Sequence, residues 1–382
     1  MKTIVDPLTE VFVIGGSHQN ALGVLRALGR KGIRPFFILV GNKKKASICR
    51  SRYIKRWVIK EFDEVVPFLL EQKKGWKQVI IACHDRIVEI LDESKKVLNP
   101  FYIIPGSSRI SIKELMNKQI MTETAIKNGF TVPRSYLVTS GITNIYGIPF
   151  PCITKPVLST AGTKHEIVVC QNLDELSEFL KKNPGHTYQI QKFIDVDFEF
   201  QLIGASCFQG EKIIIPGVSE ILHPYNGSNT HFLHYRQLTE DLKSTLSLTF
   251  KYIKEIGYSG LFSVEFLRGK DGNDYFLEMN FRNDGNTISV TNAGANLPYW
   301  WVMTSTGHDL NDPEIDHEEF VMPEYNELKL WKHGVITTEE FFNDLKKTTS
   351  FTKYASDDKW PTYGKTVFYV KFLLTSIGRL LK

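Results

Sequence analysis

Apolar residues follow two different periods along the first hundred positions of the chain. Four short apolar runs predict buried strands, and a helical pattern at 20–32 predicts a helix that closes at Gly32. The four strands are expected at 10–16, 34–40, 53–60 and 77–85. Strands that alternate with helices are typical of a parallel sheet, so residues 1–117 are expected to form a Rossmann-like α/β domain.

Three further units are expected after residue 117. Residues 118–195 combine a first helix with short strands around a capped helix, which predicts a small α+β unit. Residues 196–310 contain alternating strands, a long amphipathic helix and a hairpin at 261–282, which predicts a larger antiparallel sheet. Residues 311–382 are expected to form an extension that ends in a basic amphipathic helix.

The hairpin at 261–282 places charged and amide side chains in a row. Its second strand carries two alternating sets: Phe276, Glu278, Asn280 and Arg282 on one face, and Tyr275, Leu277, Met279 and Phe281 on the other. Asp271 and Gly272 are expected at the centre of a two-residue turn, which places Glu265 directly opposite Glu278. Facing carboxylates repel each other, so this arrangement requires a compensating charge.

A divalent cation would remove the repulsion between Glu265 and Glu278. Two carboxylates and the amide of Asn280 are oxygen ligands that suit Mg²⁺, which also holds phosphate oxygens. Apolar residues on both strands around these acids indicate that the acids are sheltered from water. The alternative is a surface hairpin with two solvated glutamates.

The hairpin resembles that of the ATP-grasp superfamily, whose last hairpin ends in an E-x-N-x-R run preceded by a lone glutamate on the neighbouring strand. Here the run is Glu278, Asn280 and Arg282, and the lone acid is Glu265. The resemblance covers about residues 10–310. It implies a preliminary α/β domain, a small lid and a larger antiparallel sheet, with ATP clamped between lid and sheet. It also implies two Mg²⁺ ions, with Mn²⁺ as an alternative, bound by the two glutamates and Asn280.

The resemblance extends to residues that would bind the nucleotide. Lys118, which opens a helix, and Lys155, in an apolar strand, resemble the family's two phosphate-binding lysines. Lys155 and Arg282 are the residues expected to act on the transferring phosphoryl group. The remaining contacts are carried over to the flap residues Ser159, Thr160 and Gly162, the adenine hinge Gln191, Lys192 and Ile194, and the ribose-binding acid Glu199. Gln191 stands where many members have glutamate, and Glu199 is offset by one residue from the expected spacing.

Substrate contacts are expected at the carboxyl edge of the parallel sheet. Ser17 is expected to be the N-cap of the first helix, whose amides would face an anion, and Asp85 follows the fourth strand at the same edge. An alternative role for Asp85 is to cap the following helix. Arg236, in a polar stretch of the larger sheet, is a candidate for holding a substrate carboxylate.

The turn after the first strand also bears on dinucleotide binding. The stretch GGSHQNALG lacks the G-x-G-x-x-G spacing, and Lys43, Lys44 and Lys45 follow the second strand where an acid would hold a ribose. NAD is therefore not expected. These lysines favour a 2′-phosphate, so an NADP-dependent oxidoreductase is kept as an alternative, while a solvated basic loop is the simpler interpretation.

Composition narrows the classes of partner. The 382 residues carry a net charge of +5, which suits anionic small ligands or a membrane surface but falls short of a nucleic-acid-binding protein. The five cysteines show neither metal nor disulfide spacing, and no run of about 18 apolar residues occurs, so a cytoplasmic protein is expected. The basic segment 364–382 is expected to pack against its own domain or a sister subunit of a homodimer, or else to contact the inner membrane face.

Together these features predict an ATP-dependent ligase. A small carboxylate would attack the γ-phosphate of ATP to give an acyl phosphate, and an amine would then displace phosphate to form an amide. The layout is similar to ATP-grasp carboxylate–amine ligases, including the D-aspartate ligases and carbamoyl-phosphate-synthase-like proteins. A nucleotide-binding protein of the same fold without turnover is the alternative.

Overall fold

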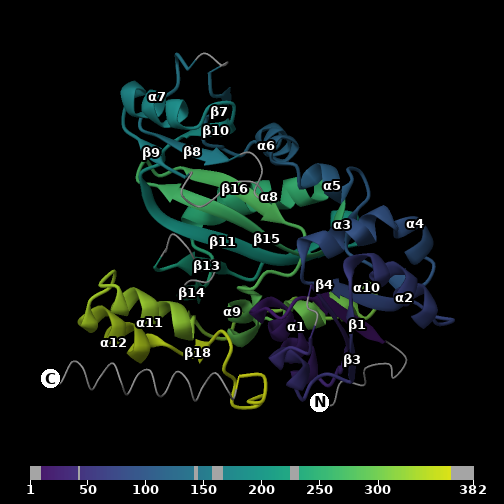
Figure 1. Ribbon diagram of the computed structural model, residues 1–382. Coiled ribbons are helices and arrows are strands. Elements are labelled where there is room, and N and C mark those ends of the chain that lie inside the picture. The colour runs from purple at the N-terminus through teal and green to yellow at the C-terminus, as the bar shows by residue number, and fades with distance from the viewer. Residues whose placement is uncertain (1–9, 42–43, 142–144, 157–166, 224–231, 363–382) are drawn as a thin grey trace.

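The computed structural model describes residues 10–41, 44–141, 145–156, 167–223 and 232–362. Figure 1 shows three sheets: a parallel sheet near the N-terminus, a small sheet at the far end of the molecule, and a large sheet between them. The mixed α/β architecture agrees with the expected fold class, and the order of the three sheets along the chain follows the hydrophobic pattern.

The parallel sheet has the strand order β3-β2-β1-β4-β5. Its strands are β1 (Val11–Gly15), β2 (Phe36–Val40), β3 (Arg56–Lys60), β4 (Gln78–Ala82) and β5 (Tyr102–Ile103). The helices of this unit are α1 (Gln19–Arg30), α2 (Val65–Gln72), α3 (Asp85–Glu93) and α4 (Lys95–Leu98), with 3-10 turns at Ser47–Arg50 and Phe62–Glu64. Every residue of β1, β2 and β4 is buried, as expected for parallel strands covered by helices.

Helix α1 begins one residue later than its predicted cap implies. His18 is the N-cap, and its Nδ1 accepts a hydrogen bond from the backbone N–H of Asn20 at 3.4 Å. The prediction that Ser17 caps this helix is therefore wrong, because the ring nitrogen of the next residue fills the role. Gly15 is explained by packing, since a Cβ at this position would lie 2.8 Å from the Cβ of Cys83.

The small sheet has the order β7-β10-β8-β9 and is antiparallel. Its elements are α6 (Lys118–Lys127), β7 (Ser135–Thr139), β8 (Cys152–Pro156), β9 (Val169–Cys170), α7 (Leu173–Lys182) and β10 (Thr187–Lys192). This unit has a hydrophobic core of its own, which includes Val138, Cys152, Leu176, Tyr188 and Ile190. It matches the small lid of the expected two-part fold.

The large sheet has nine strands in the order β16-β15-β11-β13-β14-β17-β18, with β12 on β11 and β6 on β15. The strands are β6 (Gly106–Ser107), β11 (Val196–Cys207), β12 (Lys212–Ile214), β13 (Val218–Ile221), β14 (Leu233–Arg236), β15 (Tyr258–Gly269), β16 (Asp274–Asn280), β17 (Glu319–Met322) and β18 (Ser350–Phe351). The remaining described helices are α5 (Ile112–Leu115), α8 (Lys243–Ile256), α9 (Thr287–Asn292), α10 (Leu297–Ser305), α11 (Glu324–Lys332) and α12 (Thr338–Lys347), with 3-10 turns at Phe208–Gly210 and Glu240–Leu242. Because β17 pairs with β14, part of the segment 311–382 belongs to this sheet.

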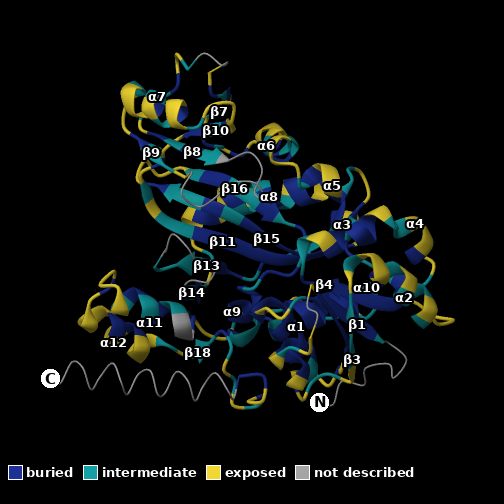
Figure 2. Cartoon of the chain, viewed as in Figure 1, coloured by how far each residue is buried: buried dark blue, intermediate teal, exposed yellow. Residues whose placement is uncertain are grey.

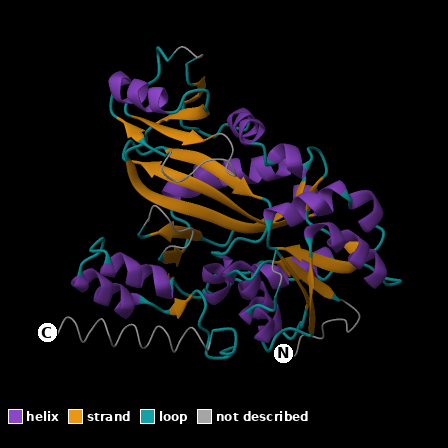
Figure 3. Ribbon diagram, in the orientation of Figure 1, coloured by secondary structure: helices purple, strands orange, loops and turns teal. Residues whose placement is uncertain are grey.

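One hydrophobic core joins the parallel sheet to the large sheet. It contains Phe12 and Ile80 of the first unit together with Phe262 and Val264 of β15 and Ile253 of α8. Figure 3 shows α8 running along the large sheet, and in Figure 2 the strands β4, β11 and β15 are mainly buried. These two units therefore pack as a continuous body, and the small sheet stands apart with its separate core.

The described helices include none with the length and apolar character required to cross a membrane. Residues 363–382, where the basic amphipathic helix is expected, lie outside the described residues.

Helix α8 is followed by the C-cap residue Gly257, whose φ of 66° lies in the left-handed region. We expect Gly257→Ala to lower the free energy of unfolding by roughly 1–2 kcal/mol, because a Cβ disfavours this conformation and would lie 2.2 Å from the Ser108 hydroxyl. Urea denaturation measures the change. Gly75→Ala is the matched control, since Gly75 lies outside the left-handed region with no neighbour within 4 Å. Equal effects of the two substitutions would contradict this account.

Candidate active site

A cavity of about 580 Å³ lies where the carboxyl ends of β1 and β4 meet the hairpin β15–β16. It is lined by Gly16, His18, Gln19, Asn20, Cys83, His84, Asp85, Glu199, Gln201, Ile221, Glu265, Glu278, Asn280, Arg282, Asp284, Gly285 and Asn286. Five of these side chains are carboxylates and only one is a guanidinium. The cavity therefore has a strong excess of negative charge, which favours bound cations.

The predicted pairing of Glu265 with Glu278 is confirmed, but the hairpin reaches it differently. Three residues, 270–272, form the turn in place of two, and Gly272 has a φ of 80°. A β-bulge absorbs the additional residue, because Leu277 has no partner on β15. The two changes cancel, so the acids face each other although the predicted turn is wrong.

Because of the bulge, the predicted assignment of Phe276 to the cavity face of β16 is wrong. Phe276 was expected on the same face as Glu278, but it shares the hydrophobic core with Met279 and Phe281. Its ring packs 5.2 Å from that of Phe130, measured between centroids. The physical reason is that burial of a large apolar ring is favourable. The extra residue in the strand lets Phe276 point into the core while Glu278 still points toward the cavity.

Two side-chain amide groups hold Glu265 in place. Its Oε1 accepts hydrogen bonds from Gln201 Nε2 and from Asn280 Nδ2, both at 3.0 Å. Burial among protein atoms, followed by the charges of Glu278 and Asp284, raises the pKa of Glu265 to about 8. The side chain nevertheless borders the cavity, so a cation can reach it.

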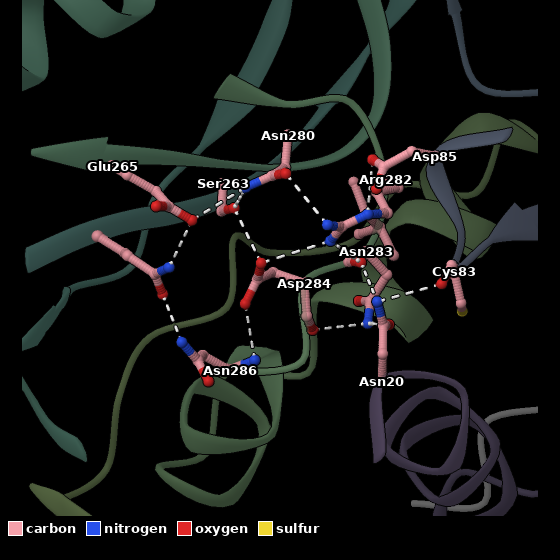
Figure 4. A network of polar contacts seen from close by, with 12 residues as sticks. Asn20, Cys83, Asp85, Ser263, Glu265, Asn280, Arg282, Asn283, Asp284 and Asn286 are labelled. Atoms are coloured by element: carbon pink, nitrogen blue, oxygen red, sulfur yellow. Dashed lines mark hydrogen bonds and ion pairs between the residues drawn. The ribbon is translucent and has the colours of Figure 1, made fainter. Parts of the chain in front are cut away.

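Arg282 connects the hairpin to the parallel sheet (Figure 4). Its Nε donates to Asp85 Oδ1 at 2.8 Å and its Nη2 to Asn280 Oδ1 at 3.1 Å, while Nη1 lies 3.5 Å from Asp284 Oδ2. Burial disfavours the charge, but Asp85 and Asp284 more than compensate and raise the pKa of Arg282. The guanidinium is therefore kept charged at the edge of the cavity.

Asp85 is a partner of Arg282, and it does not cap helix α3. The N-cap is His84, whose Nδ1 accepts from the backbone N–H of Arg86 at 3.2 Å. The alternative capping role for Asp85 is therefore wrong. The predicted position of Asp85 at the carboxyl edge, among the cavity residues, agrees with the structure.

Several supporting residues were not predicted. Asn283 Nδ2 donates to Asn20 Oδ1 at 2.5 Å, and Asn20 Nδ2 donates in return to the Asn283 carbonyl at 2.6 Å. The two carboxylate oxygens of Asp284 accept hydrogen bonds from the Ser263 hydroxyl and from the backbone N–H of Asn286. This network fixes the loop that follows β16, as Figure 4 shows, and so orients Arg282.

The two lysines of the lid share an electrostatic environment with the acids of the large sheet. Burial and the nearby charge of Lys118 lower the pKa of Lys155, whereas Glu278 and Glu199 act in the opposite direction. Lys155 Nζ donates to Gln191 Oε1 at 2.8 Å. A neutral amide thus positions the ammonium group without neutralising it, which leaves its charge available to an anion.

Other predicted residues lie apart from this group. The flap residues Ser159, Thr160 and Gly162 lie outside the described residues. In the hinge, Lys192 is exposed and Ile194 is buried. Ser17 is exposed and does not line the cavity.

Arg236 lies outside the cavity, contrary to the expectation that it helps to shape the substrate pocket. Its Nε donates to Glu220 Oε1 at 2.9 Å. Glu220 pairs across the strands with Phe200, so the two side chains lie on the same face of the sheet. This face is the one away from the cavity, where Phe200 packs in the hydrophobic core. Arg236 pairs with Val218, which lies two residues before Glu220 on the same strand. Because side chains alternate between the two faces of a strand, Arg236 lies on this face as well.

The raised pKa of Glu265 predicts how stability depends on pH. In the folded protein Glu265 keeps its proton up to about pH 8. In the unfolded chain a glutamate with the ordinary pKa of 4.5 has lost its proton at this pH. The free energy of unfolding should therefore fall as pH rises from about 5 to 8 when divalent cations are absent. Urea denaturation in EDTA at several pH values should show a flatter profile for Glu265→Gln than for the wild type. Parallel profiles would contradict the assignment.

No protein-family model matches the chain. It is 26% identical over 214 residues to the formate-dependent phosphoribosylglycinamide formyltransferase of Prochlorococcus marinus subsp. pastoris, which covers 48% of this chain and 54% of that protein. The chain thus spans little more than half the length of the curated relatives that it matches.

Many solved structures share the fold, and two of them are compared with this chain. One is an ADP complex of N5-carboxyaminoimidazole ribonucleotide synthetase, with a TM-score of 0.65, 16% identity and coverage of 88% of this chain and 87% of that one. The other is the L-amino acid ligase from Bacillus licheniformis, with a TM-score of 0.57, 16% identity and coverage of 76% and 72%. The chain has the ATP-grasp fold.

Proposed function

We propose that the protein is an ATP-dependent ligase that joins a carboxylate to an amine and releases ADP and phosphate. The observation that carries this proposal is the cavity with five carboxylates, two of which, Glu265 and Glu278, face each other across a β-ribbon. Such a cavity would repel a polyphosphate unless divalent cations were bound. Oxygen donors from both glutamates and Asn280 fit Mg²⁺, with Mn²⁺ as an alternative. When bound, the metal supplies neutralisation of phosphate charge.

The positions of the basic residues support nucleotide binding between the lid and the large sheet. We assign Lys118 and Lys155 to the phosphates, because both ammonium groups lie close enough to influence one another and Lys155 also interacts with Glu278 and Glu199. Glu199 lines the cavity and is assigned to the ribose. The hinge residues Gln191, Lys192 and Ile194 and the flap residues Ser159, Thr160 and Gly162 remain predicted contacts of adenine and phosphates.

The proposed reaction has two steps. A carboxylate oxygen of the substrate attacks the γ-phosphorus and ADP leaves, which gives an acyl phosphate. The amine nitrogen then attacks the acyl carbon, loses a proton and displaces phosphate. Arg282, fixed by Asp85, is placed to stabilise the charge that develops on the transferred group. No step requires a nucleophilic side chain of the protein.

The comparisons agree with this class of reaction. One of the two similar structures is that of a ligase, and the other is that of a synthetase bound to ADP. The small carboxylate and amine, a homodimer and a peripheral membrane contact through residues 363–382 stay predictions.

The test is a screen of amino acids, hydroxy acids and amines for stimulated ADP formation by the full chain with Mg²⁺. We expect ADP and phosphate release that depends on both an acid and an amine. Release that requires neither would contradict the ligase assignment. ATP binding without release for any pair would favour the nucleotide-binding protein without turnover. A fluorescence titration with NADPH that showed saturable binding would favour the oxidoreductase.

A further inference from the structure

A second group of ligand-type side chains lies away from the cavity. His223 follows β13, Glu327 belongs to α11 and Asp344 belongs to α12. One nitrogen or oxygen atom from each of the three side chains lies within 4.8 Å of the other two. His223 Nε2 and Asp344 Oδ2 are 2.8 Å apart. The end of β13 and the two consecutive helices α11 and α12 thus converge on one point.

Glu327 is the member of this group that requires a partner. It is only 1% exposed, yet neither of its carboxylate oxygens has a hydrogen-bond partner among the described residues. Burial of a carboxylate without any donor is costly, and a second carboxylate, Asp344, lies beside it. Two buried acids beside one imidazole leave a negative charge that a bound cation would balance.

The surroundings hold the three side chains in place. The ring of His223 stacks on Phe232 with 6.1 Å between centroids and an angle of 15° between planes. Helices α11 and α12 have a small core of their own, in which Trp331 stacks on Phe341 at 5.1 Å. Each ligand therefore projects from an element that is fixed by apolar packing, as metal sites in proteins require.

We propose that His223, Glu327 and Asp344 bind a divalent transition-metal ion such as Zn²⁺. One imidazole nitrogen and two carboxylate oxygens are the donors that such ions accept, whereas Mg²⁺ and Ca²⁺ prefer oxygen alone. Tetrahedral Zn²⁺ with bonds of about 2.0–2.2 Å keeps its ligand atoms about 3.3–3.6 Å from one another. His223 and Asp344, whose nearest atoms are 2.8 Å apart, would separate slightly on binding, and the other ligand atoms already lie within 4.8 Å of one another.

The ion would tie helices α11 and α12 to the end of strand β13. Ile221, two residues before His223, lines the cavity described above. The site is thus separate from the candidate active site but connected to it through one strand. This inference does not depend on the proposed ligase activity.

The full chain, freed of metal with EDTA, equilibrated with Zn²⁺ and desalted without nucleotide, should retain one Zn²⁺ per chain by elemental analysis. Glu327→Gln and His223→Ala should each weaken Zn²⁺ binding roughly tenfold or more. Glu339→Gln, which alters an exposed acid near Asp344 on α12, should bind like the wild type. Glu278→Gln should also retain the ion, because that residue belongs to the separate cavity.

Retention of no Zn²⁺ by the wild type, or equal retention by Glu327→Gln, would overturn the proposal. Should a variant fail to fold, anomalous scattering from a Zn²⁺-soaked wild-type crystal decides the question. The expected peak lies between the three side chains, and a peak elsewhere or none would refute the site.

Discussion

Replacing Glu278 by glutamine is expected to lower ATP-dependent phosphate release by about 10²- to 10³-fold. The substitution preserves the shape of the side chain but removes a negative oxygen opposite Glu265. The remaining ligands would hold the metal less tightly, and the phosphoryl group would lose charge compensation during transfer. Glu278 also helps to raise the pKa of Glu265, so in this variant that pKa should move toward its ordinary value.

The effect of Glu278→Gln is measured as ADP formation over a range of Mg²⁺ concentrations, with the acid and amine that the screen identifies. Higher Mg²⁺ should restore part of the activity if metal binding is weakened. Glu314→Gln is the matched control, because Glu314 does not line the cavity. A rate within twofold of the wild type would remove Glu278 from the proposed site.

Changing Arg282 to lysine is expected to lower kcat by about 10²-fold, and changing it to alanine by roughly 10³-fold or more. Lysine keeps the positive charge but cannot reproduce the fork that contacts Asp85 and Asn280 together. The Kd for ATP should change little, because the guanidinium is assigned to the group in transfer and not to the bound nucleotide. If the Kd for ATP changed while kcat stayed the same, Arg282 would contribute to binding of the nucleotide and not to transfer of the phosphoryl group.

Arg268→Lys is the control for the Arg282 variants. Arg268 also bonds to two acids, Asp241 and Asp274, but it lies outside the cavity. We expect it to affect stability without a comparable loss of kcat. Similar losses in both variants would indicate that general destabilisation is the cause.

The acid pair could be predicted from the sequence because local signals define it. Period-two alternation and the Asp271-Gly272 turn signal place Glu265 opposite Glu278 when the turn has two residues. The three-residue turn alone would pair Glu265 with Leu277, and the bulge restores the pairing. The bulge could not be foreseen. It arises because Phe276 packs against Phe130, a contact between residues that are distant in the chain.

The supporting network escaped prediction for the same reason. Asn20 and Asn283 are separated by 263 positions, and each looks like an ordinary polar residue of a turn. His223 and Asp344, 121 positions apart, show no ligand spacing either. Alternation along β11 could have indicated Gln201, because it lies two residues after Glu199 and shares its face. Site residues can be predicted from the sequence when a single helix or strand carries them together, whereas the residues of this network come from several elements.

The unpaired Leu277 separates the tip of the hairpin from its base. Because the bulge takes up a one-residue difference, loops of two or three residues can both keep the acids opposed. A deletion of one residue at the tip would then be compensated by loss of the bulge, and Glu265 would stay opposite Glu278. The hairpin therefore has a built-in tolerance to length change that a uniformly paired ribbon lacks.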